Sequence, residues 1–162
     1  MGEIFWSELT SGLIDPDQLA HVVVRLLAAM LLGAIVGYQR ERAGKAAGLR
    51  THILVALGTT LFVLAAAGSG MSSDGISRVI QGISTGIGFI GAGAILKLSA
   101  REEIQGLTTA AGIWMTAAIG VAVGLGGLGL ALLGTILTWA ILASIDLLEK
   151  HENEGDATRK KK

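Results

Sequence analysis

The sequence contains no cysteine, so disulfides, thiolate metal sites and cysteine nucleophiles are excluded. Charge is also scarce, because Asp, Glu, Lys and Arg make up 16% of the 162 residues. Residues 105–145 contain none of these four, and this stretch is long enough to cross a bilayer core of ~30 Å twice. Serine and histidine do not combine with a buried acid, and no metal-ligand or nucleotide-loop spacing occurs. We therefore expect neither an enzyme nor a cofactor.

What the sequence has instead is hydrophobic residues (51%) and 24 glycines, with the charges gathered in clumps. This composition is typical of an integral membrane protein. The net charge of zero does not indicate a partner, and no nucleic acid is expected. The expected partner is the lipid bilayer, and we expect an all-α fold.

Five transmembrane helices are predicted from the apolar runs. Residues 1–14 favour a short interfacial helix, and Asp15 followed by Pro16 is a typical helix start. The leading segment is acidic and the apolar run long, which disfavours a cleaved signal peptide. We divide the chain into an extracytoplasmic segment 1–15, a membrane domain 16–148 and a polar tail 149–162. The five spans of the membrane domain lie near 16–38, 52–68, 79–96, 107–123 and 128–148.

Positive charge predicts the orientation. Basic residues gather in the first and third connections and in the tail, while the N-terminus and the loop with Asp74 are acidic. Cytoplasmic loops carry the excess of Lys and Arg, which predicts N-out and C-in. The basic residues are Arg40, Arg42, Lys45 and Arg50, then Lys97 and Arg101, then 159–162.

An internal repeat is suggested by two similar segments, 48–51 (GLRT) and 106–109 (GLTT), each of which follows a charged loop. A second pair, 33–34 and 91–92 (both GA), has the same separation in sequence. The hairpins of spans one and two and of spans three and four would be related by an axis along the membrane normal, with the fifth helix added. Chance alignment of glycine-rich segments is the alternative.

Small residues form faces along the helices, which is how helices associate in lipid. In the third span, isoleucines fall on one side, and small or polar residues occupy most of the remaining circumference, so this helix should be the most enclosed. Local unwinding of residues 86–93 to offer carbonyls to an ion is the alternative. The faces exceed what five short helices need, so a homo-oligomer is expected. The packing glycines are Gly33, Gly37, Gly82, Gly86, Gly93, Gly112 and Gly120.

Arg25 lies about three turns into the first span, where a cation is costly unless it pairs or reaches water. It shares a helix face with Gly33 and Arg40 and should look into the protein. Its hydrogen bonds could be accepted by several groups: backbone carbonyls, Gln81, the Thr85 hydroxyl, a lipid phosphate or Asp74. It is either a structural anchor or part of an ion or ligand pathway.

A second polar site is expected at the cytoplasmic end, where Glu41 is an acid among bases. Threonines at the starts of two helices favour an anion there, and a carboxylate held by two helix N-termini would form a closed gate. The alternative is that the bases only fix topology and touch lipid headgroups. No metal site is assigned, and His52 is not included. The members are Arg40, Glu41, Arg50, Thr51, Lys97, Thr108 and Thr109.

Several ordered motifs lie across residues 20 to 145. They are 25–28 (RLLA), 32–37 (LGAIVG), 40–42 (RER), 47–52 (AGLRTH), 88–95 (GFIGAGAI) and 106–111 (GLTTAA), with Trp114. Together they resemble the MgtC/SapB family of bacterial inner-membrane proteins. The chain departs from the family pattern at Gln39, where Glu is usual. Only about a dozen polar residues follow the fifth span, so functions of the C-terminal cytoplasmic domain found in MgtC-type members are expected to be absent.

The resemblance implies a link to magnesium limitation and to survival in acid or inside host cells. Two functions remain open. The chain is a membrane regulator that docks against another membrane protein through small-residue faces, or a small transporter or channel with a pathway past Arg25 to Arg40, Glu41 and Arg50.

Overall fold

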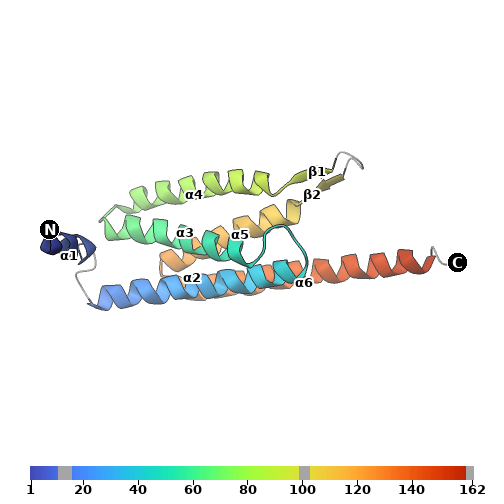
Figure 1. Cartoon of the computed structure of the whole chain (residues 1–162), viewed down its shortest axis with the longest axis horizontal. Helices are drawn as coiled ribbons and strands as arrows, with labels where there is room; N and C mark the ends of the chain where they lie inside the picture. Colours follow the sequence, from blue (N-terminus) through green and yellow to red (C-terminus); the bar gives the residue numbers. More distant parts are fainter. Residues whose placement is uncertain (11–15, 99–102, 160–162) are drawn as a thin grey trace.

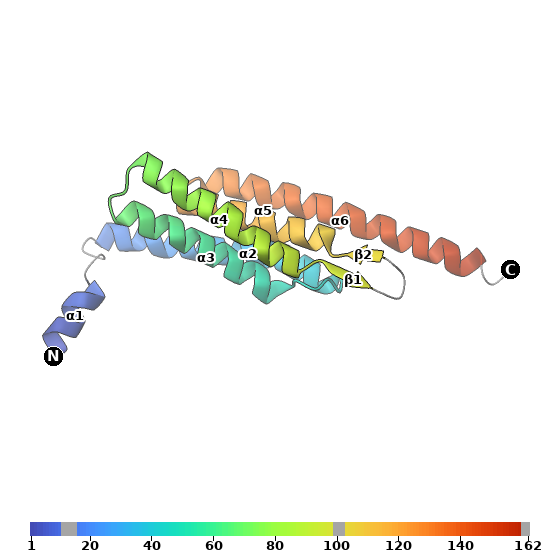
Figure 2. The same cartoon turned by 90° about the horizontal axis from the view of Figure 1, so that it is seen from above.

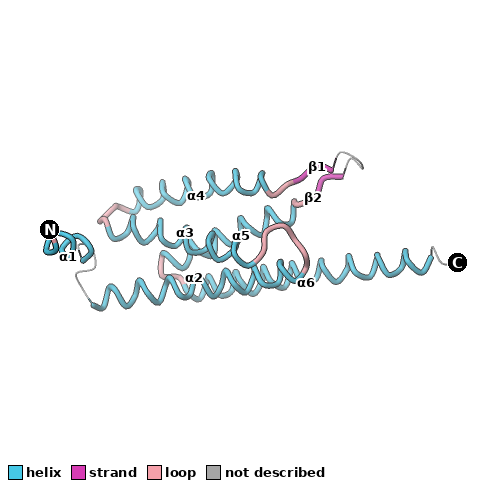
Figure 3. The backbone as a smooth tube through the Cα atoms, viewed as in Figure 1, coloured by secondary structure: helices cyan, strands magenta, loops and turns pink. Residues whose placement is uncertain are grey.

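The computed structural model describes residues 1–10, 16–98 and 103–159. Within them the chain forms six helices and two short strands (Figures 1 and 3). In chain order the elements are α1 (Gly2–Thr10), α2 (Pro16–Arg42), α3 (Leu49–Gly68), α4 (Ser73–Gly93), β1 (Leu96–Leu98), β2 (Glu103–Gln105), α5 (Leu107–Gly124) and α6 (Leu128–Arg159).

Helices α2 to α6 lie roughly parallel or antiparallel to one another in an elongated bundle, with α1 set apart at the N-terminal end (Figures 1 and 2). Successive helices alternate in direction, so α2, α4 and α6 run the same way. The connection from α2 to α3, the β-hairpin and the C-terminal end of α6 therefore share one end of the molecule, here called the hairpin end. Arg40 at the end of α2, Lys45 in the connection after it and Lys97 in β1 lie at this end.

Three helices are long and apolar enough to cross a membrane among the described residues: α2, α3 and α5. The apolar part of α6 is the shorter segment Leu128–Ser144. Helix α4 is outside this group, because Asp74 and Arg78 occupy its start and glycine and hydroxyl residues much of its length. The helical fold and its fit to a lipid bilayer agree with the sequence prediction.

The bundle centre is built by α3 and α5, with α2 against both. Close approach of these helices depends on glycine: a Cβ added at Gly33 would lie 2.8 Å from the carbonyl oxygen of His52, and one at Gly37 would lie 2.8 Å from Leu49 Cα. Gly120 brings α5 equally close to α3, since an added Cβ would lie 2.6 Å from the Ala56 carbonyl oxygen. Small residues thus let the backbones touch, as expected for helices in lipid.

Threonines occupy the buried layer between these helices. The Thr60 hydroxyl crosses from α3 to donate to the Gly120 carbonyl of α5 at 2.8 Å. Thr59 and Thr135 instead donate to carbonyls of their own helices. Each hydroxyl therefore has an acceptor, which removes the cost of burying it.

The expectation that the third span is the most enclosed is wrong. In α4 only Ile87 and Gly91 are buried, and Phe89 is 85% exposed. Added Cβ atoms at Gly82, Gly86 and Gly93 would meet nothing within 4 Å. The helix is continuous from Ser73 to Gly93, so the unwound alternative does not occur. These three glycines face away from the chain because α4 packs along one side only, mainly on α5, where Gly91 lies.

The hairpin after α4 was not predicted from the sequence. The third span was expected to reach Leu96, but α4 ends at Gly93 and Leu96 begins β1. Strands β1 and β2 pair antiparallel, with Lys97 opposite Ile104. The pairing ties the end of α4 to the start of α5.

The two helical hairpins share equivalent contacts. Gly33 of α2 packs on His52 of α3, and Gly91 of α4 packs on Ala110 of α5, where an added Cβ would lie 3.6 Å from the alanine Cβ. The separation in sequence from Gly33 to Gly91 is the same as that from His52 to Ala110. Gly48 and Gly106, at this offset as well, each precede a helix. The two hairpins thus place these glycines at equivalent positions, and the parallel repeat stays a prediction.

Candidate functional site

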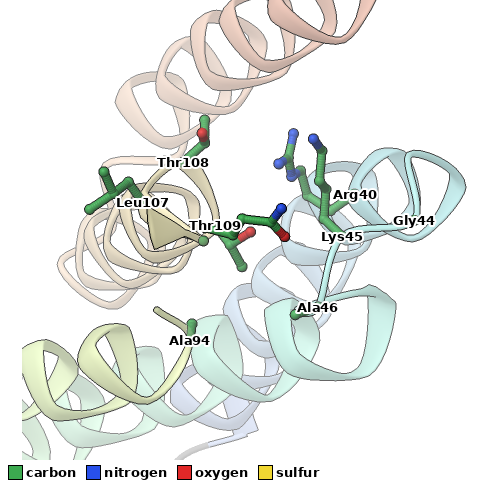
Figure 4. A pocket seen from close by; sticks show the side chains of 10 residues that line it. Arg40, Gly44, Lys45, Ala46, Ala94, Leu107, Thr108 and Thr109 are labelled. Carbon is green, nitrogen blue, oxygen red and sulfur yellow. The ribbon is translucent and has the colours of Figure 1, made fainter. Parts of the chain in front are cut away.

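A cavity of about 640 Å³ opens at the hairpin end of the bundle (Figure 4). Its wall comes from the last turn of α2 with the loop that follows, from Ala94 at the end of α4, and from residues 105–109 at the start of α5. Segments far apart in sequence thus converge on one space.

Arg40 supplies the most buried charged side chain of this wall, with 1% of its surface exposed. It lies in the last turn of α2, where the negative end of the helix dipole stabilises a cation. The guanidinium interacts elsewhere in the chain, while its Nε and Nη2 atoms are buried without a hydrogen bond among the described residues.

Lys45 reaches the same cavity through a tight turn after α2. Its backbone N–H donates to the Arg40 carbonyl at 3.1 Å, and Gly44 adopts a φ of 67°, which suits glycine. The side chains of Arg40 and Lys45 consequently lie next to each other, facing the start of α5 (Figure 4).

The opposite wall is the N-terminus of α5. Gly106 precedes this helix with a φ of 97° and provides no side-chain cap. A Cβ there would collide with the Ala94 carbonyl oxygen, so only glycine fits. Thr108 and Thr109 follow in the first turn and line the cavity, with Thr109 almost fully buried. The first N–H groups of a helix lack partners within it and carry partial positive charge.

The electrostatics of the cavity favour negative charge. Two cationic side chains and the positive end of a helix dipole meet there, and none of the described lining residues is acidic. Gln105 and Thr108 add neutral polar groups. Chemically, such a wall can hold an anion by hydrogen bonds and charge.

Glu41 lies outside this wall, although it follows Arg40 directly. Its Oε2 atom accepts a hydrogen bond from the backbone N–H of Leu49 at 2.8 Å. The carboxylate therefore caps the first turn of α3 after Gly48, which has no side chain to do so. In the structure the acid is held by one helix N-terminus.

Arg25 lies at the other end of the bundle. Its Nη1 atom donates to the Gly124 carbonyl, the last residue of α5, at 3.0 Å. Gly126, with a φ of 87°, leaves room for the guanidinium, because an added Cβ would lie 2.7 Å from Nη2. Asp74, one suggested partner, pairs with Arg78 instead. A backbone carbonyl was among the expected acceptors.

Comparison with known proteins identifies the family of this chain. The family model described as the MgtC family matches residues 26–151. The chain belongs to the MgtC family. It is 45% identical over 137 residues to SrpB of Synechococcus elongatus, covering 78% of this chain and 75% of that protein. No solved structure matches it significantly.

Two further MgtC-family relatives have names that refer to magnesium or to the family itself. YhiD of Escherichia coli K12, proposed as a magnesium transporter, is 40% identical over 130 residues, or 76% of this chain and 60% of YhiD. MgtC of Salmonella typhimurium is 44% identical over 115 residues, or 71% of this chain. The chain spans only 48% of that protein.

Four of the remaining polar residues singled out in the sequence do not line the cavity: Gln81, Thr85, Arg50 and Thr51. Gln81 and Thr85 are exposed on α4, where the Thr85 hydroxyl donates to the Gln81 carbonyl. Arg50 is exposed and Thr51 half-buried at the start of α3. Lys97 lies in β1, and its side chain is outside the described part. Arg40, Thr108 and Thr109 are thus the members that the fold brings together.

Sequence reasoning missed three residues of this MgtC-family chain. Lys45 and Gln105 line the cavity, and both flank segments that carry the family motifs. His52 is fully buried, with Nδ1 2.7 Å from the Thr116 hydroxyl. The signal for His52 was its place one turn after Gly48, on the face that meets Gly33 and Gly37. No group of three or more His, Asp or Glu side chains suited to a metal occurs within the described ranges.

Proposed function

We propose that this MgtC-family chain is a non-enzymatic protein of the bacterial cytoplasmic membrane that regulates another membrane protein. Its process would be magnesium homeostasis and adaptation to stress or to a host. Membership of the MgtC family and the proposed transport of magnesium by YhiD support the link to magnesium.

The outward face of α4 is the observation that carries the regulatory role. Gly82, Gly86 and Gly93 leave open space on a helix that covers the rest of the bundle along one side. Helices in lipid gain stability from close backbone packing at small residues, and lipid tails fill such a surface poorly. A helix of a partner membrane protein would pack there; a second copy of this chain is the other occupant to test.

The proposed topology has five crossings, with α4 and α6 added to the three long apolar helices. The N-terminus is outside and the hairpin end cytoplasmic, because basic connections gather at that end. Helix α4 crosses despite its polar start if its glycine face is covered by protein rather than lipid.

Enlarging Gly86 tests the docking role. Gly86→Leu should abolish growth support at low magnesium while the protein still accumulates and unfolds normally, since no part of the chain occupies that space. Gly129→Leu is the matched control, because Gly129 of α6 also has nothing within 4 Å. Gly112 does not suit this test, since its added Cβ would meet His52 and Leu142 inside the bundle. Full growth with Gly86→Leu would contradict docking through α4.

A transporter or channel remains the second function, and the cavity at Arg40 is the observation in its favour. Its pathway would run past Arg25 to Arg40, Glu41 and Arg50. Proteoliposomes with internal Mg²⁺ and pH reporters separate the two functions. Flux that is lost in Arg25→Gln or Glu41→Gln would establish transport, and absence of flux from folded protein would favour the regulator.

A further inference from the structure

We propose that His52 is a proton-operated contact, whose protonation loosens the start of α3 from α2 and α5. The inference goes beyond the docking role of α4, because it concerns a signal to which the chain responds. Its test needs no docking partner.

His52 joins three helices. Its own segment of α3 lies against α2, since a Cβ added at Gly33 would be 2.8 Å from the His52 carbonyl oxygen and one at Gly37 would be 2.9 Å from His52 Cβ. The imidazole reaches toward α5, where Cε1 would lie 3.7 Å from a Cβ added at Gly112. The residue is fully buried. Any change in what the ring requires of its surroundings therefore acts on the packing of all three helices.

The two ring nitrogens have different surroundings. Nδ1 lies 2.7 Å from the Thr116 hydroxyl, and that hydroxyl already donates to the Gly112 carbonyl, so Nδ1 is the donor of the pair. Nε2 is then the unprotonated nitrogen of a neutral ring. It is buried and makes no hydrogen bond with the described residues. The packed interface therefore fits the neutral imidazole.

Protonation changes this balance. A proton on Nε2 adds an N–H donor and a positive charge at a buried atom that has no hydrogen-bond acceptor in the described chain. A buried donor is costly without an acceptor, and a buried charge is costly without a partner. The charged ring is therefore better accommodated in a conformation that brings Nε2 to water or to a carbonyl.

The charged neighbour of the ring comes from α2. The Arg40 guanidinium acts on the imidazole electrostatically, and the Ala47 carbonyl of the next connection lies close enough to accept from it. Like charges repel, so a second cation does not suit this space. From the other sides the described chain presents uncharged residues, Gly112 and Thr116 of α5 and Leu142 of α6.

The direction of the response follows from linkage. A ring that takes up a proton more readily in the loosened state shifts the equilibrium toward that state as the pH falls. Histidine in contact with water titrates near about pH 6.5, so loosening begins below that value. The movement reaches the cavity, because the connection before α3 contributes Ala46 to the cavity wall.

Amide exchange of the full chain in detergent micelles tests the proposal between about pH 8 and about pH 5, corrected for the intrinsic effect of pH on exchange. His52→Asn keeps an amide donor near the position of Nδ1 and removes the titrating nitrogen. His52→Gln is the second variant if His52→Asn does not fold. His21→Asn is the matched control, because His21 is exposed on α2.

We expect exchange at residues 52–56 and 112–117 of the natural chain to accelerate about tenfold at the acid end of this range. The acceleration should disappear in the His52 variants and persist in His21→Asn. Nitrogen NMR of labelled histidine in the natural chain should show Nε2 of His52 gaining its proton over the same pH range, and this measurement needs no variant.

Three results would overturn the proposal. They are a natural chain without acceleration, equal acceleration in the natural chain and a folded His52 variant, and loss of the acceleration in His21→Asn. An Nε2 atom that stays unprotonated while exchange accelerates would overturn it as well.

Discussion

Nδ1 of His52 and the hydroxyl oxygen of Thr116 lie 2.7 Å apart in the buried interface between α3 and α5. The Thr116 hydroxyl also donates to the Gly112 carbonyl at 2.9 Å, so its oxygen is free to accept from a protonated Nδ1. Together with the hydrogen bond from the Thr60 hydroxyl to the Gly120 carbonyl, this pair joins the two central helices. It orients the imidazole one turn inside the bundle from the start of α3.

Thr116→Val tests this pair. The substitution keeps the side-chain shape and leaves the buried Nδ1–H without its acceptor, which should lower the free energy of unfolding by about 1 to 3 kcal/mol. Unfolding in mixed micelles measures the loss. Thr135→Val is the control, because the Thr135 hydroxyl is equally buried but donates only to Ala131 of its own helix. Equal losses in both variants would argue against the cross-helix bond.

Gly120→Ala tests the close approach of α3 and α5. The added methyl group would contact the Thr59 hydroxyl and lie 2.6 Å from the Ala56 carbonyl oxygen, so we expect destabilisation of roughly 1 to 3 kcal/mol. Gly58→Ala, in the middle of α3 with nothing within 4 Å, should instead stabilise by up to about 1 kcal/mol through helix propensity. Thermal unfolding of the two variants in parallel gives the sign of each effect.

Glu41→Ala removes the cap of α3. Loss of the hydrogen bond to the Leu49 N–H should cost at most about 1 kcal/mol, because the carboxylate is exposed. Faster amide exchange at residues 49–51 would locate the effect at the helix start. Unchanged exchange there would show that Glu41 does not cap α3 in the membrane.

Arg25→Gln tests the anchor at the other end of the bundle. Without the bond to the Gly124 carbonyl, amide exchange in the turn at residues 125–128 should accelerate about tenfold. Arg78→Gln also removes a cation near this end, but Arg78 is exposed and pairs with Asp74 one turn away. Equal acceleration in the two variants would show that overall charge, rather than this bond, holds the turn.

Helix positions could be predicted from the sequence because their signals are local. Pro16 begins α2, and the segment after Gly106 begins α5 at Leu107 as expected. Apolar run length predicted other boundaries less well, since α4 begins at Ser73 rather than near 79 and α6 continues to Arg159 rather than ending near 148. At Leu96 the chain forms a strand, because the pairing of Leu96 with Gln105 is a contact that an apolar run does not reveal.

Contacts within the site were harder to predict. The basic cluster and the threonines at the start of α5 were identified together, but the sequence could not separate Arg40, which enters the cavity, from Glu41 beside it. A glycine face also has the same pattern whether it meets the chain, as at Gly33, or opens outward, as at Gly86. Only the packing of α4 distinguishes them.

The contact between Ala94 and Gly106 has a mechanical consequence. The two backbones touch so closely that a Cβ at Gly106 would overlap the Ala94 carbonyl oxygen, and the paired strands β1 and β2 connect the same two residues along the chain. Helix α4 therefore cannot slide along its axis without carrying the first turn of α5 with it. Because Ala94 and the first turn of α5 both line the cavity beside Arg40, a displacement of α4 would be transmitted directly to the cavity wall.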